Sequence, residues 1–267
     1  MSMGVLTSLW NRLLSSRVLI VSTLVGLVLW QAAVRTLNVP KFLVPAPTDV
    51  LQEFLSNQAW YWNHAYYTLS ATLLGFAIAV VFGVILAIVI ISSRWVEQTI
   101  YAGLVAFNSI PKVAIAPLFI IWVGTGFASK VTMAAVISIF AIVINAVLGL
   151  RSLDPDLVDL ARSMGAGREG LLIKIQFPNA LPGLFSGMKV GISLALIGTI
   201  VGEFVASSSG LGYVIMTAQS TFATPRIFAA LVLLALMGTI LFFVIDVLER
   251  LILPWHVSNR QEAAGHA

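Results

Sequence analysis

The sequence predicts an all-α integral membrane protein with six transmembrane helices, and three observations support this fold class. Of the 267 residues, 59% are apolar and only 10% are charged, whereas a soluble domain carries about 25% charged residues. The mean hydropathy is +0.99. The apolar residues also gather in long runs, and a helix needs about 20 mostly apolar residues to cross a bilayer. These features exclude water as the main solvent of the chain.

Six apolar runs define the expected spans. The first is rather short, but it is longer than the apolar core of a typical signal peptide, and no small-x-small cleavage site follows it, so we interpret it as a retained span. The third contains Pro111 and Pro117, so it is either one interrupted span or a short interfacial helix followed by a span that starts near Pro111. In chain order, the expected spans are 18–34, 69–92, 100–123, 131–150, 181–206 and 228–253.

Basic residues flank these spans unevenly. If both termini are cytoplasmic, nine Arg and Lys residues lie on the inner flanks and four, including Lys130, lie on the outer flanks. Because positive residues concentrate on the cytoplasmic side, we expect a multi-pass membrane protein with both ends inside. The expected organisation is an N-terminal segment with the first span and an external amphipathic stretch (1–65), a core of five spans (66–257) and a tail (258–267).

Two of the spans carry a small residue at every fourth position. Small residues let helix backbones approach closely, and dispersion forces then hold the helices together in lipid. We favour packing within the chain over a seam between two copies, although such rows serve both purposes. The rows are Gly75, Ala79, Gly83 and Ala87 in the second span, and Gly183, Gly187, Gly191 and Ala195 in the fifth.

Several kinds of chemistry are excluded or not expected. The chain has no cysteine, and its three histidines are far apart in sequence, so neither a thiolate nor a metal site is expected. It lacks the G-x-x-x-x-G-K-[ST] loop that cradles phosphates, so ATP and Mg²⁺ would have to bind on another subunit. No catalytic constellation is apparent, and the net charge of +4 gives no reason to expect a nucleic-acid partner.

The most informative segment is the polar loop 151–180, between the fourth and fifth spans. Asp154 as a cap and Pro155 in the first turn predict a short helix over 156–164. The run Gly165-Ala-Gly167 ends that helix, and a second helix is expected over 168–177, ended by Pro178. Two short helices joined by a glycine bend form a compact protrusion that can dock a soluble partner.

The spacing in this loop resembles the EAA motif of ABC importer permeases: Glu-Ala-Ala, three residues, Gly, nine residues and Ile-x-Leu-Pro. The chain has Asp159-Leu160-Ala161, then Gly165 at the matching offset, then Ile175-Gln176-Phe177-Pro178. Leu160, in place of the usual alanine, puts close helix packing there in question. The stretches PKVAIAPLFIIWVGTG from Pro111 and EFVASSSGLG from Glu203 resemble the nitrate/sulfonate/taurine branch of these permeases, and the resemblance covers about residues 45–257.

The resemblance implies a type I ABC importer (MetI-like) permease fold with cytoplasmic coupling helices, in the inner membrane of a bacterium. It also implies a second copy of the chain, two cytoplasmic ATPase subunits that bind ATP and Mg²⁺, and an external substrate-binding protein. The solute would be small, such as nitrate, a sulfonate or taurine, or a related thiamine-precursor or riboflavin-like ligand. The residues implied to couple the chain to the ATPase are Asp159, Ala161, Arg162, Met164, Gly165, Ala166, Ile175 and Pro178.

Polar side chains within the spans are candidates for the translocation pathway, because a charge near the bilayer centre costs about 2.5–3.5 kcal/mol. Lys112 either attracts an anionic solute or extends to the inner interface. Glu203 either shapes an outer gate or is a satisfied carboxylate at a helix end. Asn108 and Asn145 either line the pathway or bridge helices.

Three further charges lie in or near the last two spans. Lys189 is about two turns into the fifth span, where it either reaches the interface or lines the pathway. Asp246 and Glu249 are expected to pair locally with Arg250. An ion-coupled secondary carrier, with such carboxylates as proton relays and no ATPase, is the alternative function, and a membrane-embedded enzyme is disfavoured.

Overall fold

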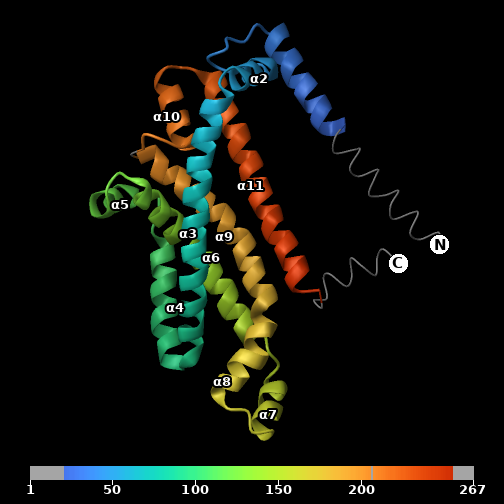
Figure 1. Cartoon of the computed structure of the whole chain (residues 1–267), viewed down its shortest axis with the longest axis vertical. Helices are drawn as coiled ribbons and strands as arrows, with labels where there is room; N and C mark the ends of the chain where they lie inside the picture. Colours follow the sequence, from blue (N-terminus) through green and yellow to red (C-terminus); the bar gives the residue numbers. More distant parts are fainter. Residues whose placement is uncertain (1–20, 206, 255–267) are drawn as a thin grey trace, which may run out of the picture.

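The computed structural model describes residues 21–205 and 207–254, and this part of the chain contains helices and turns but no strand. An apolar helix at Val21–Thr36 comes first. Figure 1 shows the others, which are α2 (Pro47–Ser56), α3 (Gln58–Ser92), α4 (Arg94–Ser109), α5 (Ala116–Val123), α6 (Phe127–Arg151), α7 (Pro155–Ser163), α8 (Arg168–Leu171), the π-helical turn η1 (Leu172–Gln176), α9 (Phe177–Val205), α10 (Leu211–Ser220) and α11 (Thr224–Ile252).

Four helices of the described chain are long and apolar enough to cross a membrane: α3, α6, the continuous helix from Glu169 to Val205, and α11. Their lengths of 35, 25, 37 and 29 residues exceed the roughly 20 residues that a span needs. The first expected span corresponds to Val21–Thr36, with residues 18–20 outside the described part. The six-helix count therefore stays a prediction, while the all-α membrane fold is confirmed.

The expected third span, 100–123, is wrong as a continuous helix. Helix α4 ends at Ser109, a turn occupies residues 110–115, and α5 has only eight residues, which is too short to cross the bilayer. Pro111 explains the break, because its ring disfavours helical geometry in the residue before it and its nitrogen has no hydrogen to donate. Pro117 is tolerated because it lies in the first turn of α5.

Helix α6 lies at the centre of the molecule, packed along α9 on one side and α3 on the other. The small-residue rows face it. A β-carbon added to Gly75 would lie 2.4 Å from Cβ of Ala134, and one added to Gly187 would lie 2.7 Å from Cβ of Asn145. The backbones therefore approach as closely as glycine allows, which confirms that these rows serve packing within the chain.

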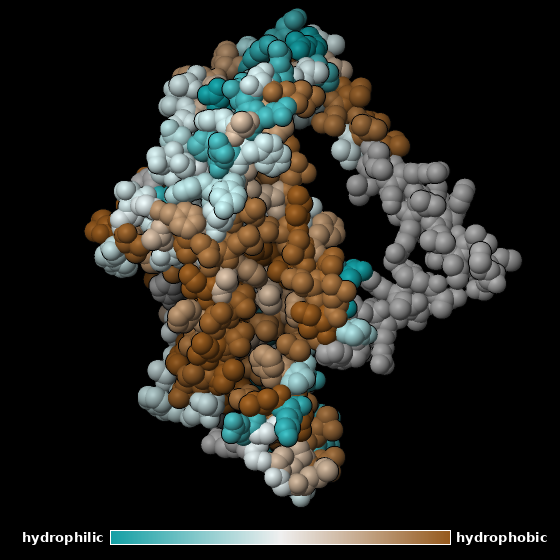
Figure 2. All heavy atoms as spheres, viewed as in Figure 1, coloured by the Kyte–Doolittle hydropathy of each residue, from teal (hydrophilic) through white to brown (hydrophobic). Residues whose placement is uncertain are grey.

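The surface has the polarity of a membrane protein. In Figure 2, apolar residues cover the middle of the visible face, and polar residues gather at its two ends. Helix α7 lies at one end and α10 near the other (Figure 1). Because loop 151–180 is expected on the cytoplasmic side, we call the end with α7 the inner end and the end with α10 the outer end.

Candidate functional site

The inner-end loop contains the two short helical segments and the glycine bend that the sequence predicts. Helix α7 begins at Pro155, and the carboxylate of Asp154 accepts a hydrogen bond of 3.0 Å from the backbone N–H of Asp156. This bond satisfies one of the free N–H groups of the first turn. The expected cap and the expected helix are both confirmed.

Gly165 forms the bend by closing a Schellman motif. The N–H of Gly165 donates to the carbonyl of Arg162 (2.9 Å), and the N–H of Ala166 donates to the carbonyl of Ala161 (3.0 Å). Gly165 has φ = +84°, whereas an added β-carbon would meet nothing within 4 Å. The position therefore requires glycine for its backbone conformation and not for lack of space.

Helix α7 presents apolar side chains although its sequence is polar. Leu157, Leu160 and Met164 are 50%, 57% and 79% exposed, whereas Ala161 is buried. The exposure of Leu160 answers the doubt about packing, because this side chain projects away from the chain instead of separating two helices. The ion pair of Arg162 with Asp159 spans 3.7 Å between exposed side chains, so it adds little stability.

The second short helix does not end at Pro178 as expected. The chain passes from α8 through η1 into α9, where Pro178 and Pro182 both lie within the helix. The N–H of Phe177 donates to the carbonyl of Leu172, five residues back, so the helix is widened by one residue just before the first proline. The widened turn accommodates the proline ring, so the helix continues past Pro178 although its nitrogen has no hydrogen to donate. Ile175 and Pro178 are both half-buried.

A cavity of about 550 Å³ separates this loop from the inner ends of α3 and α6. Its lining combines apolar groups such as Ile88 with the polar side chains of Arg151, Arg162 and Glu169. Arg151 also forms an ion pair with Glu97 of α4. The loop is thus connected to the spans through its two chain ends, with open space between.

At the outer half of the bundle lies a second polar region. Within the described residues, all fully buried polar or charged side chains belong to α3, α6 and α9. We call them the outer polar cluster: Thr68, Thr72, Ser129, Lys130, Ser138, Thr199 and Glu203.

Hydrogen bonds connect the helices within this cluster. The hydroxyl of Thr68 donates to Oε1 of Glu203 (2.8 Å), and the N–H of Gly212 donates to Oε2 (2.7 Å). The hydroxyls of Thr72 and Thr199 lie 3.0 Å apart. Glu203 is 1% exposed, so these donors replace the water that a carboxylate would otherwise bind.

Sequence reasoning missed two members of this region. Lys130 had been counted among the outer flanks, yet it is fully buried, its Nζ donates to the carbonyl of Thr125 (2.5 Å), and its charge attracts Glu203. His64 was given no role by the sequence, and its Nδ1 accepts a hydrogen bond of 2.9 Å from the N–H of Gly210. A signal was present in the spacing, because His64, Thr68 and Thr72 recur every four residues and so share one face of α3.

The charges of the last two spans form an inner charged cluster, which consists of Lys189, Asp246, Glu249 and Arg250. Nζ of Lys189 lies 2.5 Å from Oδ1 of Asp246 and 2.6 Å from Oε2 of Glu249. The expected pairing of Asp246 with Arg250 is confirmed at 3.0 Å. The cluster joins α9 to α11 across the helix interface.

The four pathway candidates lie on different elements. Lys112 is in the turn before α5, half-buried, with Nζ 6.0 Å from the ring centroid of Phe140. The amide of Asn145 donates to the carbonyl of Ala141 in its own helix (2.8 Å). Asn108 lies on α4, and its side chain is outside the described part. Their role in transport, like that of Glu203, stays a prediction.

Comparison with known proteins defines the family. Residues 79–255 match the family described as binding-protein-dependent transport system inner membrane component. The chain is 42% identical over 240 residues to the riboflavin transport system permease protein RibX of Chloroflexus aurantiacus, which covers 89% of this chain and 90% of that protein. It is 31% identical to the formylaminopyrimidine transport permease protein ThiX of Halalkalibacterium halodurans (86% and 92%) and 32% identical to the putative aliphatic sulfonates transport permease protein SsuC of Escherichia coli (87% and 89%).

Solved structures agree on the fold. The chain resembles the MetNI methionine ABC transporter in an inward-facing conformation with a TM-score of 0.61 and 23% identity, over 73% of this chain and 97% of that one. It resembles an amino acid ABC transporter with histidines with a TM-score of 0.58 and 19% identity, over 79% and 97%. The membrane-spanning helices and the family match define a multi-pass inner-membrane permease. The chain belongs to the inner membrane components of binding-protein-dependent transport systems, which are the permease subunits of ABC importers.

Proposed function

We propose that two copies of this chain form the membrane channel of an importer, driven by two cytoplasmic ATPase subunits that bind ATP and Mg²⁺. An external binding protein delivers the solute to the outer end. The observation that supports this proposal is the inner-end loop, where α7 projects with exposed apolar side chains and is held in shape by the Asp154 cap and the Gly165 bend. A rigid apolar projection outside the membrane fits a groove on a soluble subunit.

The coupling residues divide into two groups by their role. Leu157, Leu160 and Met164 present the apolar contact surface. Ala161, Arg162 and Gly165 set the shape of the bend through their backbone hydrogen bonds. Movement of the ATPase would reach the spans through the helix that is continuous from Glu169 to Val205.

For the solute, we propose an aromatic heterocycle of the flavin or pyrimidine type. The support is the 42% identity to RibX and the 31% identity to ThiX, each over more than four-fifths of the chain. A sulfonate is the second candidate, favoured by the 32% identity to SsuC. Uptake of each solute by vesicles that contain the complex and its binding protein separates the two. Competition by riboflavin or formylaminopyrimidine, and none by alkanesulfonates, supports the heterocycle.

The coupling role is tested by comparing two neighbouring glycines. Gly165→Val places a β-branched residue at φ = +84°, where the left-handed conformation costs about 1–2 kcal/mol or more. We expect the protein to insert normally, but ATP-driven uptake should fall about tenfold. Gly167→Val is the matched control, because Gly167 has open space around it and no left-handed φ.

Two results would contradict the proposal. Equal uptake by the two variants would remove the coupling role of the bend. A complex that transports solute without any nucleotide-binding subunit would instead favour the ion-coupled carrier. Copurification of the tagged chain from its native membrane, followed by detection of bound ATPase subunits, distinguishes these cases.

A further inference from the structure

Helix α10 is capped at its N-terminus by side chains from other helices. Its cap position is Gly210, which has no side chain to accept a hydrogen bond. The N–H of Gly210 donates to Nδ1 of His64 (2.9 Å), that of Leu211 to the hydroxyl of Thr68 (2.8 Å) and that of Gly212 to Glu203 (2.7 Å). Three successive N–H groups are therefore satisfied by α3 and α9.

These contacts form a closed unit, which we call the α10 latch: His64, Thr68, Glu203 and the backbone of residues 210–212. Thr68 joins both sides of it, because its hydroxyl accepts from Leu211 and donates to Glu203. Gly210 has φ = +105°, and a β-carbon there would lie 2.1 Å from Glu203. The latch therefore holds the N-terminus of α10 directly against α3 and α9.

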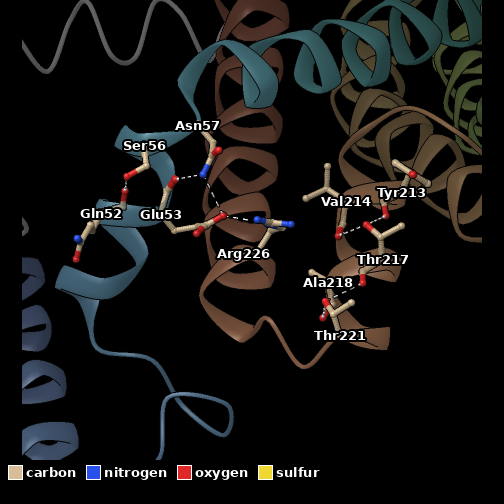
Figure 3. Close-up of polar contacts among 10 residues, drawn as sticks. All are labelled: Gln52, Glu53, Ser56, Asn57, Tyr213, Val214, Thr217, Ala218, Thr221 and Arg226. Atoms are coloured by element: carbon tan, nitrogen blue, oxygen red, sulfur yellow. Dashed lines mark hydrogen bonds and ion pairs between the residues drawn. The ribbon is translucent and has the colours of Figure 1, made fainter.

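The rest of α10 is held by apolar packing, in a buried cluster that joins Val214 to Ala229 and Leu233 of α11. Figure 3 shows that the hydroxyls of Thr217 and Thr221 donate to carbonyls of α10 itself. The neighbouring bond of 2.9 Å between Arg226 and Glu53 ties α11 to α2 and leaves α10 out. The outward side of α10 includes Met216, which is 41% exposed. Directional bonds to other helices are therefore concentrated at the N-terminus of α10, where the latch lies.

The latch lies at the end of the longest helix in the described chain. Glu203 is next to the outer end of the continuous helix from Glu169 to Val205. The inner end of that helix is part of the inner-end loop. At 1.5 Å per residue, these 37 residues span about 55 Å. Close contact of Gly187 and Gly198 with α6 restricts bending of this helix along the way.

We propose that Thr68 and Glu203 are positioning residues that transmit docking of the external binding protein from α10 to α9, and so to the ATPase. This inference rests on the proposed function, because it needs both partners. A shift of α10 cannot occur without moving Glu203 or breaking its bonds, so the position of the outer end and that of α9 are linked. Stimulation of ATP hydrolysis by the binding protein therefore depends on the hydrogen bonds of the α10 latch.

The experiment uses the full complex in lipid vesicles, with its binding protein, and measures ATP hydrolysis with and without that protein. Thr68→Val keeps the shape of the side chain but removes the hydroxyl shared by Leu211 and Glu203. We expect the ratio of stimulated to basal hydrolysis to fall about fivefold or more. Thr68→Ser retains the hydroxyl and should restore the ratio.

The matched control is Thr239→Val in α11, because the hydroxyl of Thr239 is exposed and donates to Ala235 in its own helix. A purely structural role for Thr68 would lower the yield of complex and leave the ratio unchanged, and this result would overturn the inference. If Thr68→Val fails to assemble, His64→Phe, which removes the Gly210 hydrogen bond and keeps an aromatic ring beside Trp60 and Tyr213, decides by the same ratio.

Failure of the proposed function gives a different result. If the wild-type complex contains no ATPase subunit, or if no candidate binding protein changes its rate of ATP hydrolysis, the proposed function is wrong. This inference is then wrong as well. If the wild-type complex is stimulated and the latch variants are stimulated equally, only the inference is wrong.

Discussion

The outer polar cluster and the inner charged cluster stabilise buried charges in different ways. Glu203 is 1% exposed and receives hydrogen bonds from a hydroxyl and a backbone N–H. Lys189, with its side chain 21% exposed, is instead neutralised by the two carboxylates of Asp246 and Glu249. A charge near the interface retains some water and can depend on mobile ion pairs, whereas an enclosed carboxylate needs fixed donors. The outer cluster therefore fixes the position of the α10 backbone, whereas the inner cluster only joins side chains of α9 and α11.

The largest expected effect comes from breaking the inner cluster. Lys189→Met leaves Glu249 without its cation and Asp246 with only the more exposed Arg250. We expect the free energy of unfolding to fall by about 3 kcal/mol, because an uncompensated buried charge is costly. Chemical denaturation in mixed micelles measures the change.

The control for this prediction removes all three charges together. Combining Lys189→Met with Asp246→Asn and Glu249→Gln should recover most of the lost stability, since no net charge remains buried. If the single variant were as stable as the wild type, the cluster would be hydrated enough for its ion pairs to contribute nothing.

The outer cluster should be more sensitive to added volume. Gly212→Ala would place a β-carbon 2.8 Å from Cβ of Glu203 and 2.9 Å from Oε2. We expect a loss of about 2 kcal/mol in the free energy of unfolding, typical of overpacking in a closed site. Gly103→Ala is the control, because nothing lies within 4 Å of that position and alanine favours a helix. Equal stability of the two variants would show that the outer cluster can relax.

A smaller effect is expected for the hydroxyl pair of the outer cluster. Thr72→Val or Thr199→Val alone should each cost about 1 kcal/mol, because one buried hydroxyl loses its 3.0 Å partner. The double variant should cost less than the sum, since both polar groups are gone. Strictly additive values in a double-mutant cycle, measured by denaturation, would mean that the two hydroxyls do not interact.

The smallest effect is expected where water screens the charges. Lys41 donates a hydrogen bond that holds the pKa of Asp49 below its ordinary value of 3.8. The ionised form is thus favoured in the folded state, so this contribution is present above about pH 4 and is lost as pH falls below it. Because the Lys41 side chain is 66% exposed, we expect only about 0.5 kcal/mol.

Hydrogen exchange of α2 at pH 6 and at pH 3 measures this contribution. In Lys41→Met, the difference in protection between the two pH values should shrink. An unchanged difference would assign the pH dependence to other groups around α2.

The sequence predicted features that depend on neighbouring residues better than features that depend on distant ones. The Asp154 cap, α7 and the Gly165 bend follow from about a dozen consecutive residues, and all three are confirmed. The continuous third span and the end of a helix at Pro178 were wrong. Pro111 breaks a helix, whereas the widened turn before Pro178 accommodates its ring within a continuous helix.

The outer polar cluster was missed for a different reason. Hydropathy depends only on the type of each residue, so it does not show which helix packs against that residue in the fold. Lys130 is buried because α9 approaches it at Gly202, where an added β-carbon would lie 3.3 Å from Cα of Lys130. That approach joins segments 72 residues apart in the chain. For Glu203, both the gate and the satisfied carboxylate were foreseen, and the hydrogen bonds of the second are observed.

The π-helical turn at Leu172–Gln176 has a consequence for how insertions are tolerated. One widened turn is equivalent to one extra residue accommodated within an otherwise regular helix. Deleting a single residue from this turn would restore regular winding and leave α7 and α8 in nearly the same orientation relative to α9, because the wider turn rotates the chain about as much as one residue fewer of α-helix. Deleting one residue from the regular part of the same helix would instead rotate everything before it by about 100°. The turn is therefore the place where a length change of one residue can be absorbed between the inner-end loop and the membrane helices.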